Sequence, residues 1–241
     1  MDLLFLGTRG EIDKRSPRHR RHSALLVRRG DARIVIDCGA DWRGRMHRFA
    51  PAAVVVTHAH PDHAFGLADG LPCPVYATPE TWDVLPDYPL PDRRTIRPGA
   101  SVEIGGVRFE AFAVVHSVRA PAVSYRVVAD GAIFFYVPDV VSIEDRSGAL
   151  AGADLFIGDG ATVTRSMVRR TGDALVGHTP VRTQLGWCRD EGVPRALFTH
   201  CGSQIVGGNE PALAQRVRAL GEERGVGAGI ARDGLRLALA A

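Results

Sequence analysis

The sequence predicts an α/β protein in which two β-sheets face one another and helices lie on the outside. Strand signals dominate the first 60 residues, whereas the second half alternates strand-like runs with helix-like segments. The 241 residues contain no low-complexity segment and no linker long enough to separate two domains. We therefore expect one domain over residues 1–241.

Apolar runs separated by glycine turns make up the first half. The stretch LLFLG predicts a short strand, and ALLVRRGDARIVIDCG predicts two strands around Gly30–Asp31. The β-branched run PAAVVVTH is typical of a strand buried on both faces. A proline-rich connection over 71–99 holds a short strand and a small helix. Two further hairpins are expected, with turns at Gly105–Gly106 and Asp130–Gly131.

The second half of the sequence contains three expected helix N-caps. Ser142 is expected to cap a short helix, and Thr179–Pro180 to open a helix that ends near Gly192. Asn209 is expected to cap a third helix. The runs DLFIGDG and RALFTH predict strands between these helices, and GIARDGLRLAL predicts a closing pair of strands.

The overall composition excludes several classes of protein. An apolar content of 45% with 24% charged residues is ordinary for a soluble protein. No apolar run approaches the ~20 residues that span a bilayer, and the start Met1–Asp2 lacks the basic residues of a secretory signal. We therefore expect a cytoplasmic protein with no membrane partner. Four scattered cysteines without a C-x-x-C pair predict neither a disulfide framework nor a cysteine zinc site.

The net charge of +3 is too small to predict nucleic-acid binding by itself, but the charge is unevenly distributed. The stretch DKRSPRHRRHS (13–23) contains five lysines and arginines against one acid. One interpretation is a solvated surface loop. The other is a phosphate-attracting rim, in which Arg20 and Arg21 would contact substrate. The sequence does not decide whether the loop over 14–22 reaches a substrate.

A cluster of histidines follows the valine run. Three of the nine histidines and an aspartate fall within six positions of VVVTHAHPDHAFGL (54–67). A strand that ends at Thr57 delivers this segment to a sheet edge, where functional loops usually lie. Pro61 fixes the turn, so the side chains of the cluster can converge on one point. Imidazole and carboxylate groups are ligands of zinc, manganese and iron. The cluster consists of His58, His60, Asp62 and His63.

Three further polar residues each close a hydrophobic run. His116 follows FEAFAVV, Asp139 follows AIFFYVP, and His200 follows RALFT. Any one of them alone is more often structural. Together with the cluster they supply five histidines and two aspartates, the donor count for a binuclear centre with a bridging hydroxide.

This pattern resembles the metallo-β-lactamase fold superfamily over nearly the whole chain. THAHPDH matches the H-x-H-x-D-H motif of that superfamily, and IDCG (36–39) resembles its preceding aspartate motif. The resemblance implies a four-layer αββα sandwich of two mixed β-sheets, with helices on the outer faces and the site at one edge. It also implies that Asp37 supports the metal loop without binding metal.

The same resemblance implies two divalent metal ions, zinc first, with manganese or iron as alternatives. The first metal would be held by His58, His60 and His116, the second by Asp62, His63 and His200, with Asp139 bridging them.

Two segments are similar to one branch of the superfamily, the transfer-RNA 3′-processing nucleases and the related cyclic phosphodiesterases. LGTRGEIDKRSPRHRRHSALLV resembles the opening of these enzymes, and GHTPVRTQLGWCRDEGVPRALFTHCGSQ resembles their glycine-histidine-serine/threonine motif. On that match, His178 would lie near the metals and bind a phosphate oxygen or protonate the leaving group. A structural role in a turn is the alternative. The long flexible arm of the nucleases and the cysteine-rich zinc site of the phosphonate enzymes are not evident.

We therefore expect a binuclear-metal-dependent hydrolase, a phosphodiesterase acting on a small cyclic or nucleotide-type phosphodiester or on an RNA end. The nucleophile would be a metal-bridging hydroxide, oriented by Asp62, which is also a ligand. One alternative is a thioesterase or lactonase with the same metals, and another is a non-catalytic metal-binding module. The natural substrate, the physiological metal and the oligomeric state stay open, a homodimer being one alternative.

Overall fold

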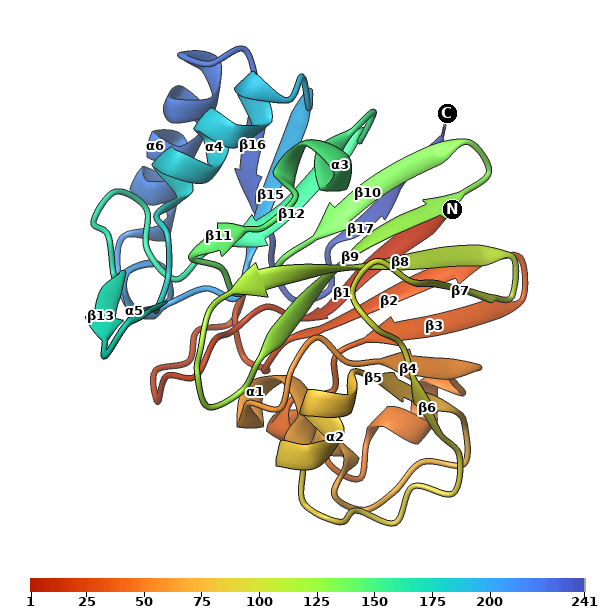
Figure 1. Ribbon diagram of the computed structural model, residues 1–241. Helices are drawn as coiled ribbons and strands as arrows, with labels where there is room; N and C mark the ends of the chain where they lie inside the picture. The colour runs from red at the N-terminus through yellow and green to blue at the C-terminus, as the bar shows by residue number, and fades with distance from the viewer. Residues whose placement is uncertain (241) are drawn as a thin grey trace.

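Two large β-sheets face each other in the computed structural model, which describes residues 1–240 (Figure 1). The first sheet begins with β17 (Arg236–Ala238) at one edge. It continues through β1 (Asp2–Gly7), β2 (Ala24–Arg29), β3 (Ala32–Ile36), β4 (Ala53–Val55), β5 (Val75–Ala77) and β6 (Arg93–Thr95). The strands from β3 to β6 run parallel to one another, whereas β17, β1, β2 and β3 alternate in direction.

The second sheet is also mixed. Its order is β11 (Ser142–Ile143), β8 (Val107–Val115), β9 (Ala122–Ala129), β10 (Ala132–Tyr136), β12 (Leu155–Asp159), β15 (Arg195–Thr199) and β16 (Gly227–Ile230). Strand β7 (Ser101–Ile104) pairs with β8, and a separate ribbon joins β13 (Arg169–Thr171) to β14 (Ala174–Val176). The strands from β10 to β16 are parallel, so their carboxyl ends meet at one edge.

Helices cover the outer faces, as expected (Figure 1). Over the second sheet lie α3 (Arg146–Leu150), α4 (Val181–Asp190), α5 (Ser203–Val206) and α6 (Glu210–Glu222). The elements beside the first sheet are shorter: α1 (Pro61–Ala64), α2 (Pro79–Val84) and the 3-10 turns Ala40–Trp42, Met46–Phe49 and Phe65–Leu67. No helix of the described chain combines the length and the apolar composition that a bilayer crossing requires.

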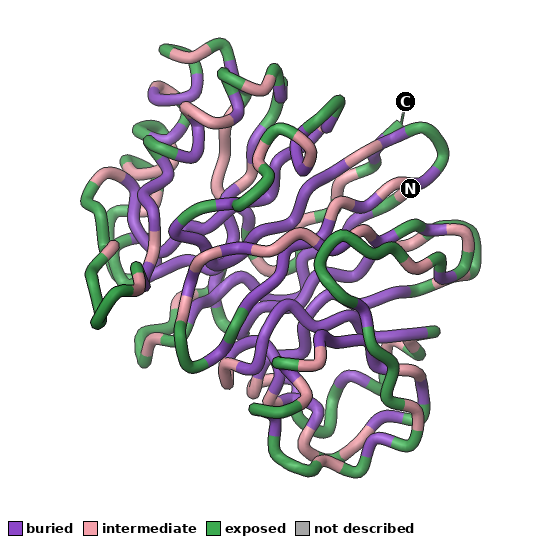
Figure 2. The backbone as a smooth tube through the Cα atoms, in the orientation of Figure 1, coloured by how far each residue is buried: buried purple, intermediate pink, exposed green. Residues whose placement is uncertain are grey.

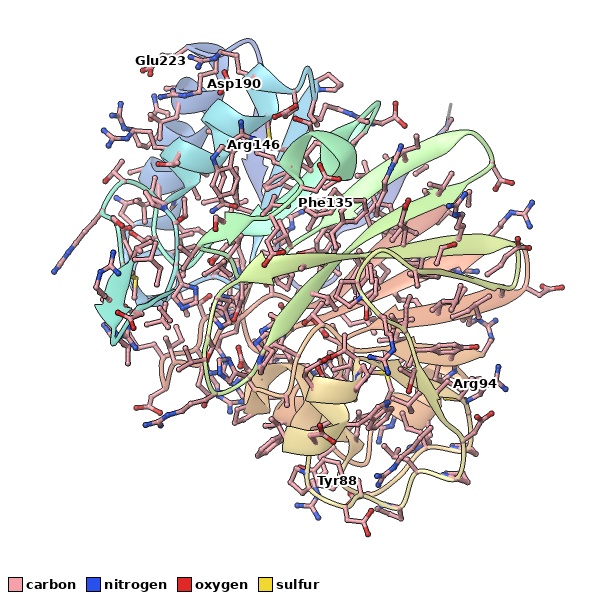
Figure 3. The ribbon with its side chains drawn as sticks, in the orientation of Figure 1. Tyr88, Arg94, Phe135, Arg146, Asp190 and Glu223 are labelled. Carbon is pink, nitrogen blue, oxygen red and sulfur yellow. The ribbon has the colours of Figure 1, made fainter. Side chains whose placement is uncertain are left out.

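Alternating side chains produce three apolar layers. In β2, Leu25 packs between the two sheets, whereas Leu26 packs outward under the 3-10 turns. In β10, Phe134 packs in the layer between the sheets, whereas Phe135 packs in the outer layer together with residues of α3 and α4. Figure 3 labels Phe135. Figure 2 shows that the buried backbone is concentrated in the two sheets. The period-two pattern of the strands therefore builds the four-layer sandwich that the resemblance implied.

The hairpin turns and one helix cap confirm the sequence prediction. Turns occur at Gly30–Asp31, Gly105–Gly106 and Asp130–Gly131, between strands paired in antiparallel register. The Asn209 side chain accepts a hydrogen bond from the backbone N–H of Ala212 and caps α6.

Two other expected caps are wrong. Ser142 lies in β11, and the short helix that follows is capped by the carboxylate of Asp145. Thr179 does not cap α4, whose N-cap residue is Pro180. The hydroxyl of Thr179 instead donates to the carbonyl of Val141 at 2.6 Å. In this position a buried tertiary partner replaces the local capping bond.

The two closing strands also differ from the prediction, because they do not pair with each other. Strand β16 pairs with β15 in the second sheet, and β17 pairs with β1 in the first. The connection between them therefore crosses from one sheet to the other.

The loop between β1 and β2 is anchored by a buried arginine. Arg9 is 2% exposed, and its guanidinium donates to His22 Nε2 at 2.6 Å and to Asp41 Oδ2 at 2.7 Å. Because Arg9 can only donate, His22 Nε2 must accept, and the imidazole is neutral. Burial and, after it, the charge of Arg9 lower the pKa of His22 to about 4.

Because His22 is buried in its neutral form, we expect the free energy of unfolding to depend on pH. Its pKa is about 4 in the folded protein and ~6.5 in the unfolded chain. The unfolded chain therefore binds an additional proton between these values, so the free energy of unfolding falls as the pH drops through this window. Between pH 7 and pH 5 the free energy of unfolding should therefore decrease less in His22→Gln than in the wild type, by roughly 1–2 kcal/mol, measured by urea denaturation at each pH. His47→Gln, which replaces an exposed histidine, provides the control variant. An unchanged slope in the His22 variant would contradict the assignment.

Candidate metal centre

Polar side chains from both sheets converge at the edge where the parallel strands end. His58 lies just beyond β4 in the first sheet, and the short helix α1 carries Asp62 and His63. Asp139 and His200 follow β10 and β15 in the second sheet. The strand order thus brings together residues that are far apart in the sequence.

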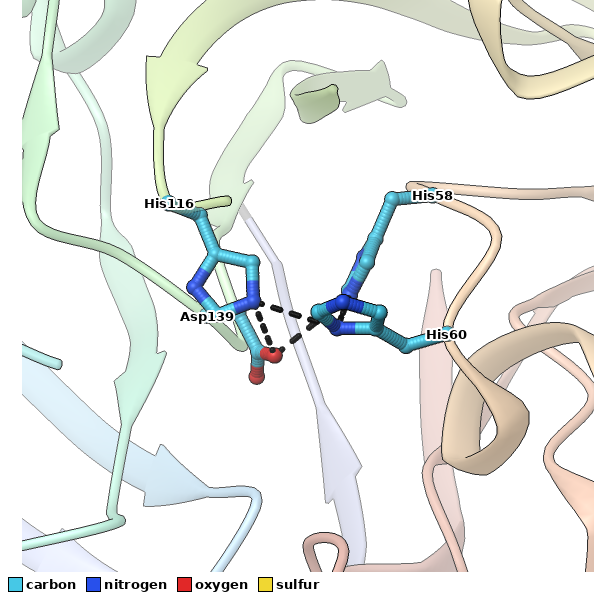
Figure 4. A group of neighbouring side chains, drawn as sticks. All are labelled: His58, His60, His116 and Asp139. Carbon is cyan, nitrogen blue, oxygen red and sulfur yellow. Dashed lines mark hydrogen bonds and ion pairs between the residues drawn. The ribbon is translucent and has the colours of Figure 1, made fainter. Parts of the chain in front are cut away.

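A first group of four converging side chains is shown in Figure 4. It consists of His58, His60, His116 and Asp139. His60 Nδ1 lies 2.9 Å from His58 Nε2 and 3.3 Å from His116 Nε2. Asp139 Oδ2 lies 3.1 Å from His116 Nε2 and 3.5 Å from His58 Nε2. A tetrahedral zinc ion with bonds of about 2.0–2.1 Å separates its ligand atoms by about 3.3–3.4 Å. The four atoms therefore have the spacing of a tetrahedral metal site.

The second group lies on the other side of Asp139. Asp62 Oδ2 is 2.9 Å from His200 Nε2 and 3.3 Å from His63 Nε2. Asp139 Oδ1 is 3.5 Å from His63 Nε2 and 3.0 Å from His200 Nδ1. Asp139 therefore presents one carboxylate oxygen to each group.

Orphaned polar atoms indicate that this arrangement suits a cation. Within residues 1–240, the buried atoms His63 Nε2, Asp139 Oδ1 and His200 Nδ1 have no hydrogen-bond partner. Each buried polar atom left unsatisfied costs ~1–3 kcal/mol. Three such atoms that face one another would be satisfied together by a divalent cation, so the residues present fit a metal.

The pKa shifts of the clustered side chains also favour a bound cation. Burial, followed by the charge of His63, holds the pKa of His58 well below its usual value. Burial would raise the pKa of Asp139, but His200 and His63 lower it well below normal. Burial would lower the pKa of His200, but Asp139 raises it well above normal. Without a cation, protons on the histidines balance the carboxylates, and a bound metal would release them.

Asp37 lies behind the cluster, at the end of β3. One of its oxygens accepts the Thr57 N–H at 2.8 Å, and the other faces His63 Nδ1 at 2.8 Å. The Nδ1–H of His63 must donate to this carboxylate, so the lone pair of Nε2 is directed at the cluster. Asp37 and His200 have φ values of 65° and 49°, in the left-handed region that non-glycine residues rarely adopt. Such strain is typical of functional sites.

Asp159, which is fully buried at the end of β12, is a further residue of the site that was not predicted from the sequence. Its Oδ2 lies 2.8 Å from His178 Nδ1, and its Oδ1 lies 3.7 Å from His200 Nδ1. Burial would lower the pKa of His178, but Asp159 raises it above the usual value. The signal was present in the sequence, because Asp159 closes a hydrophobic strand just as Asp139 and His200 do.

Two cavities open beside the cluster, and His60, His116 and His178 line both. The first has a volume of about 290 Å³ and also contains Glu11 and Met167. The second has a volume of about 380 Å³ and contains two arginines, two hydroxyl side chains and two valines: Arg119, Arg169, Ser117, Thr171, Val118 and Val176.

The structure does not bring Arg20 and Arg21 to this site, because neither lines these cavities. Their backbone N–H groups donate to Asp233 Oδ2 at 2.9 and 3.1 Å. The guanidinium of Arg21 stacks on the ring of Trp42, 4.7 Å from its centroid. The basic groups at the cluster come from other segments of the chain.

Residues 32–201 match the model of a protein family, the beta-lactamase superfamily domain. This span includes every residue of the two ligand groups. The chain belongs to this family. It is a metal-dependent hydrolase with the metallo-β-lactamase fold, which confirms the resemblance found in the sequence.

Curated relatives and solved structures agree with this family. Ribonuclease Z from Methanopyrus kandleri is 31% identical over 142 residues, which cover 52% of this chain and 49% of that protein. The chain thus matches about half the length of that relative. Ribonuclease Z from Mycobacterium bovis is 24% identical over 261 residues, covering 87% of this chain and 89% of that protein. The crystal structure of a new diphosphatase from the PhnP family has a TM-score of 0.74 at 19% identity, covering 99% and 97% of the two chains. This likeness shows a shared fold.

The position of Asp37 generates a test of the cluster. In Asp37→Asn the amide nitrogen would donate to His63 Nδ1, so the Nε2–H would point at the cluster and block this ligand. We expect zinc affinity to fall by about 10–100-fold, measured by competition with a chromophoric chelator. Asp173→Asn, in an exposed turn, should bind as the wild type does. Unchanged affinity in the Asp37 variant would exclude this supporting role.

Proposed function

We propose that the protein is a phosphodiesterase with two divalent cations, acting on cyclic or nucleotide-type phosphodiesters or RNA ends. The observation that carries this proposal is the position of Asp139, which offers one oxygen to each ligand group. A carboxylate shared in this way is typical of a two-metal site. The curated relatives named Ribonuclease Z support a phosphodiester over other substrates.

The proposed ligands come from both sheets, so we propose that residues 1–241 act as one domain. His58, His60 and His116 would hold one cation, and Asp62, His63 and His200 the other, with Asp139 shared. When bound, two divalent cations supply Lewis acidity and lower the pKa of water. Zinc suits this imidazole-rich set best, and manganese or iron are alternatives.

His178 is the proposed general acid. Its Nδ1 faces Asp159, so Nε2 is the ring nitrogen left for the cavity. The buried carboxylate favours the protonated imidazole, which can bind a phosphate oxygen and donate a proton to the leaving-group oxygen. Asp62 is held ionised, because His63 and His200 outweigh the burial that would raise its pKa. Its carboxylate would orient the attacking nucleophile as well as bind metal.

Removing the proposed acid separates catalysis from metal binding. His178→Ala should lower kcat for a phosphodiester by about 10²–10⁴-fold. The metal content, measured by elemental analysis of the dialysed protein, should stay at the wild-type level because His178 is outside the proposed ligand set. His47→Ala, an exposed histidine, provides the control. A wild-type rate in the His178 variant would exclude the role.

The reaction class is tested with three substrates in parallel. Zinc- or manganese-loaded protein is given bis-p-nitrophenyl phosphate, a thioester and a lactone, with Asp139→Ala as the blank. We expect hydrolysis of the diester that is lost in the variant together with tight metal binding. Turnover of an acyl substrate alone would instead support a thioesterase or lactonase. A metal-loaded protein that turns over none of them would support a non-catalytic module.

A further inference from the structure

We propose that the cavity containing Arg119 and Arg169 is a subsite for a second phosphate of the substrate. This inference rests on the proposed function, because it names which phosphodiesters the site would prefer. The preferred substrate would carry a further phosphate near the scissile one, either as the next phosphodiester of an oligonucleotide or as a terminal phosphate.

The two arginines come from different segments and reach the same cavity. Arg119 lies in the connection from β8 to β9, and Arg169 lies in β13. Three histidines, His60, His116 and His178, form the boundary between this cavity and the one at the cluster. A substrate whose scissile phosphate contacts the cluster can therefore extend into the arginine-lined cavity without leaving the surface.

The charge in this cavity has no partner within the protein. Among residues 1–240, neither the Arg119 nor the Arg169 guanidinium has an ion-pair or hydrogen-bond partner; the hydrogen bond from Arg119 to the Ser117 hydroxyl at 3.2 Å comes from its backbone N–H. In contrast, Arg15 of the basic loop pairs with Asp41, and Arg18 pairs with Glu210. Guanidinium groups bind phosphate with paired, charge-assisted hydrogen bonds. Both guanidinium groups of this cavity are therefore available to an anionic ligand.

Neighbouring groups favour the same occupant. The hydroxyls of Ser117 and Thr171 line the arginine cavity and can donate to phosphate oxygens. The cavity at the cluster, in contrast, is lined by the carboxylate of Glu11, which repels an anion. The two cavities thus differ in the charge of their lining residues, and this difference favours binding of the additional phosphate beside Arg119 and Arg169.

Strand geometry provides a matched control. Arg169 and Thr171 both line the cavity and are two positions apart on β13. Side chains alternate along a strand, so Arg170 faces the other side. Its guanidinium lies 3.4 Å from the carbonyl of Asp173 and does not line the cavity. Arg170→Gln removes the same charge from the same strand without changing the subsite.

The kinetic experiment uses three esters that share p-nitrophenol as leaving group. They are the p-nitrophenyl ester of thymidine 5′-phosphate, its 3′-phosphorylated form, and its form extended by a 3′-linked thymidine. We expect at least one additional phosphate to raise kcat/KM by about tenfold over the parent ester. In the double variant Arg119→Gln/Arg169→Gln this ratio should fall to about one. Arg170→Gln should keep the wild-type ratio.

The two extended esters distinguish a terminal phosphate from a bridging one. A wild-type ratio near one for both, or a ratio that survives in the double variant, would overturn the subsite while leaving the proposed function intact.

A binding measurement tests the subsite without turnover. Calorimetry with metal-loaded protein would compare thymidine 3′,5′-bisphosphate with thymidine 5′-monophosphate. We expect the bisphosphate to bind about tenfold more tightly to the wild type, and with equal affinity to the double variant. Equal affinities of the two nucleotides for the wild type would overturn the subsite, whether or not the protein hydrolyses a diester. A lack of diester hydrolysis would instead contradict the proposed function.

Discussion

The docking of the two sheets at one edge is the constraint on which the site depends. Two hydrogen bonds hold the second sheet against the first beside the histidine loop. The Tyr125 hydroxyl donates to the Val56 carbonyl at 2.8 Å, and the Val123 N–H donates to the Thr57 carbonyl at 3.0 Å. His58 comes from the first sheet and His116 from the second, so neither sheet can form the cluster alone. A slip of one residue in either strand would turn these side chains away.

Two buried aspartates orient two histidines for which we propose different chemical roles. Asp37 faces Nδ1 of His63, and Asp159 faces Nδ1 of His178. His63 is directed into the cluster, whereas His178 lines the cavities beside it. The same contact therefore orients a proposed ligand in one place and a proposed acid in the other.

Much of this arrangement was predictable from the sequence, because it depends on local patterns. Period-two runs, glycine turns and polar residues at strand ends predicted the strands and brought His116, Asp139 and His200 together. Side-chain partners were less predictable. Thr179 resembles a helix cap, but its hydroxyl bonds to Val141. Arg21 resembles a phosphate ligand, but it stacks on Trp42. Such partners follow from strand order, which the local pattern does not contain.

The separation of the cluster residues along the chain also has a kinetic consequence. His58 and His200 are more than half of the chain apart, and they meet only after β15 has joined the second sheet beside β12. Contacts of such high sequence separation usually form late in folding. A cation bound there would stabilise the native state more than the folding transition state. Metal would therefore act mainly by slowing unfolding, and the folding rate would depend little on it.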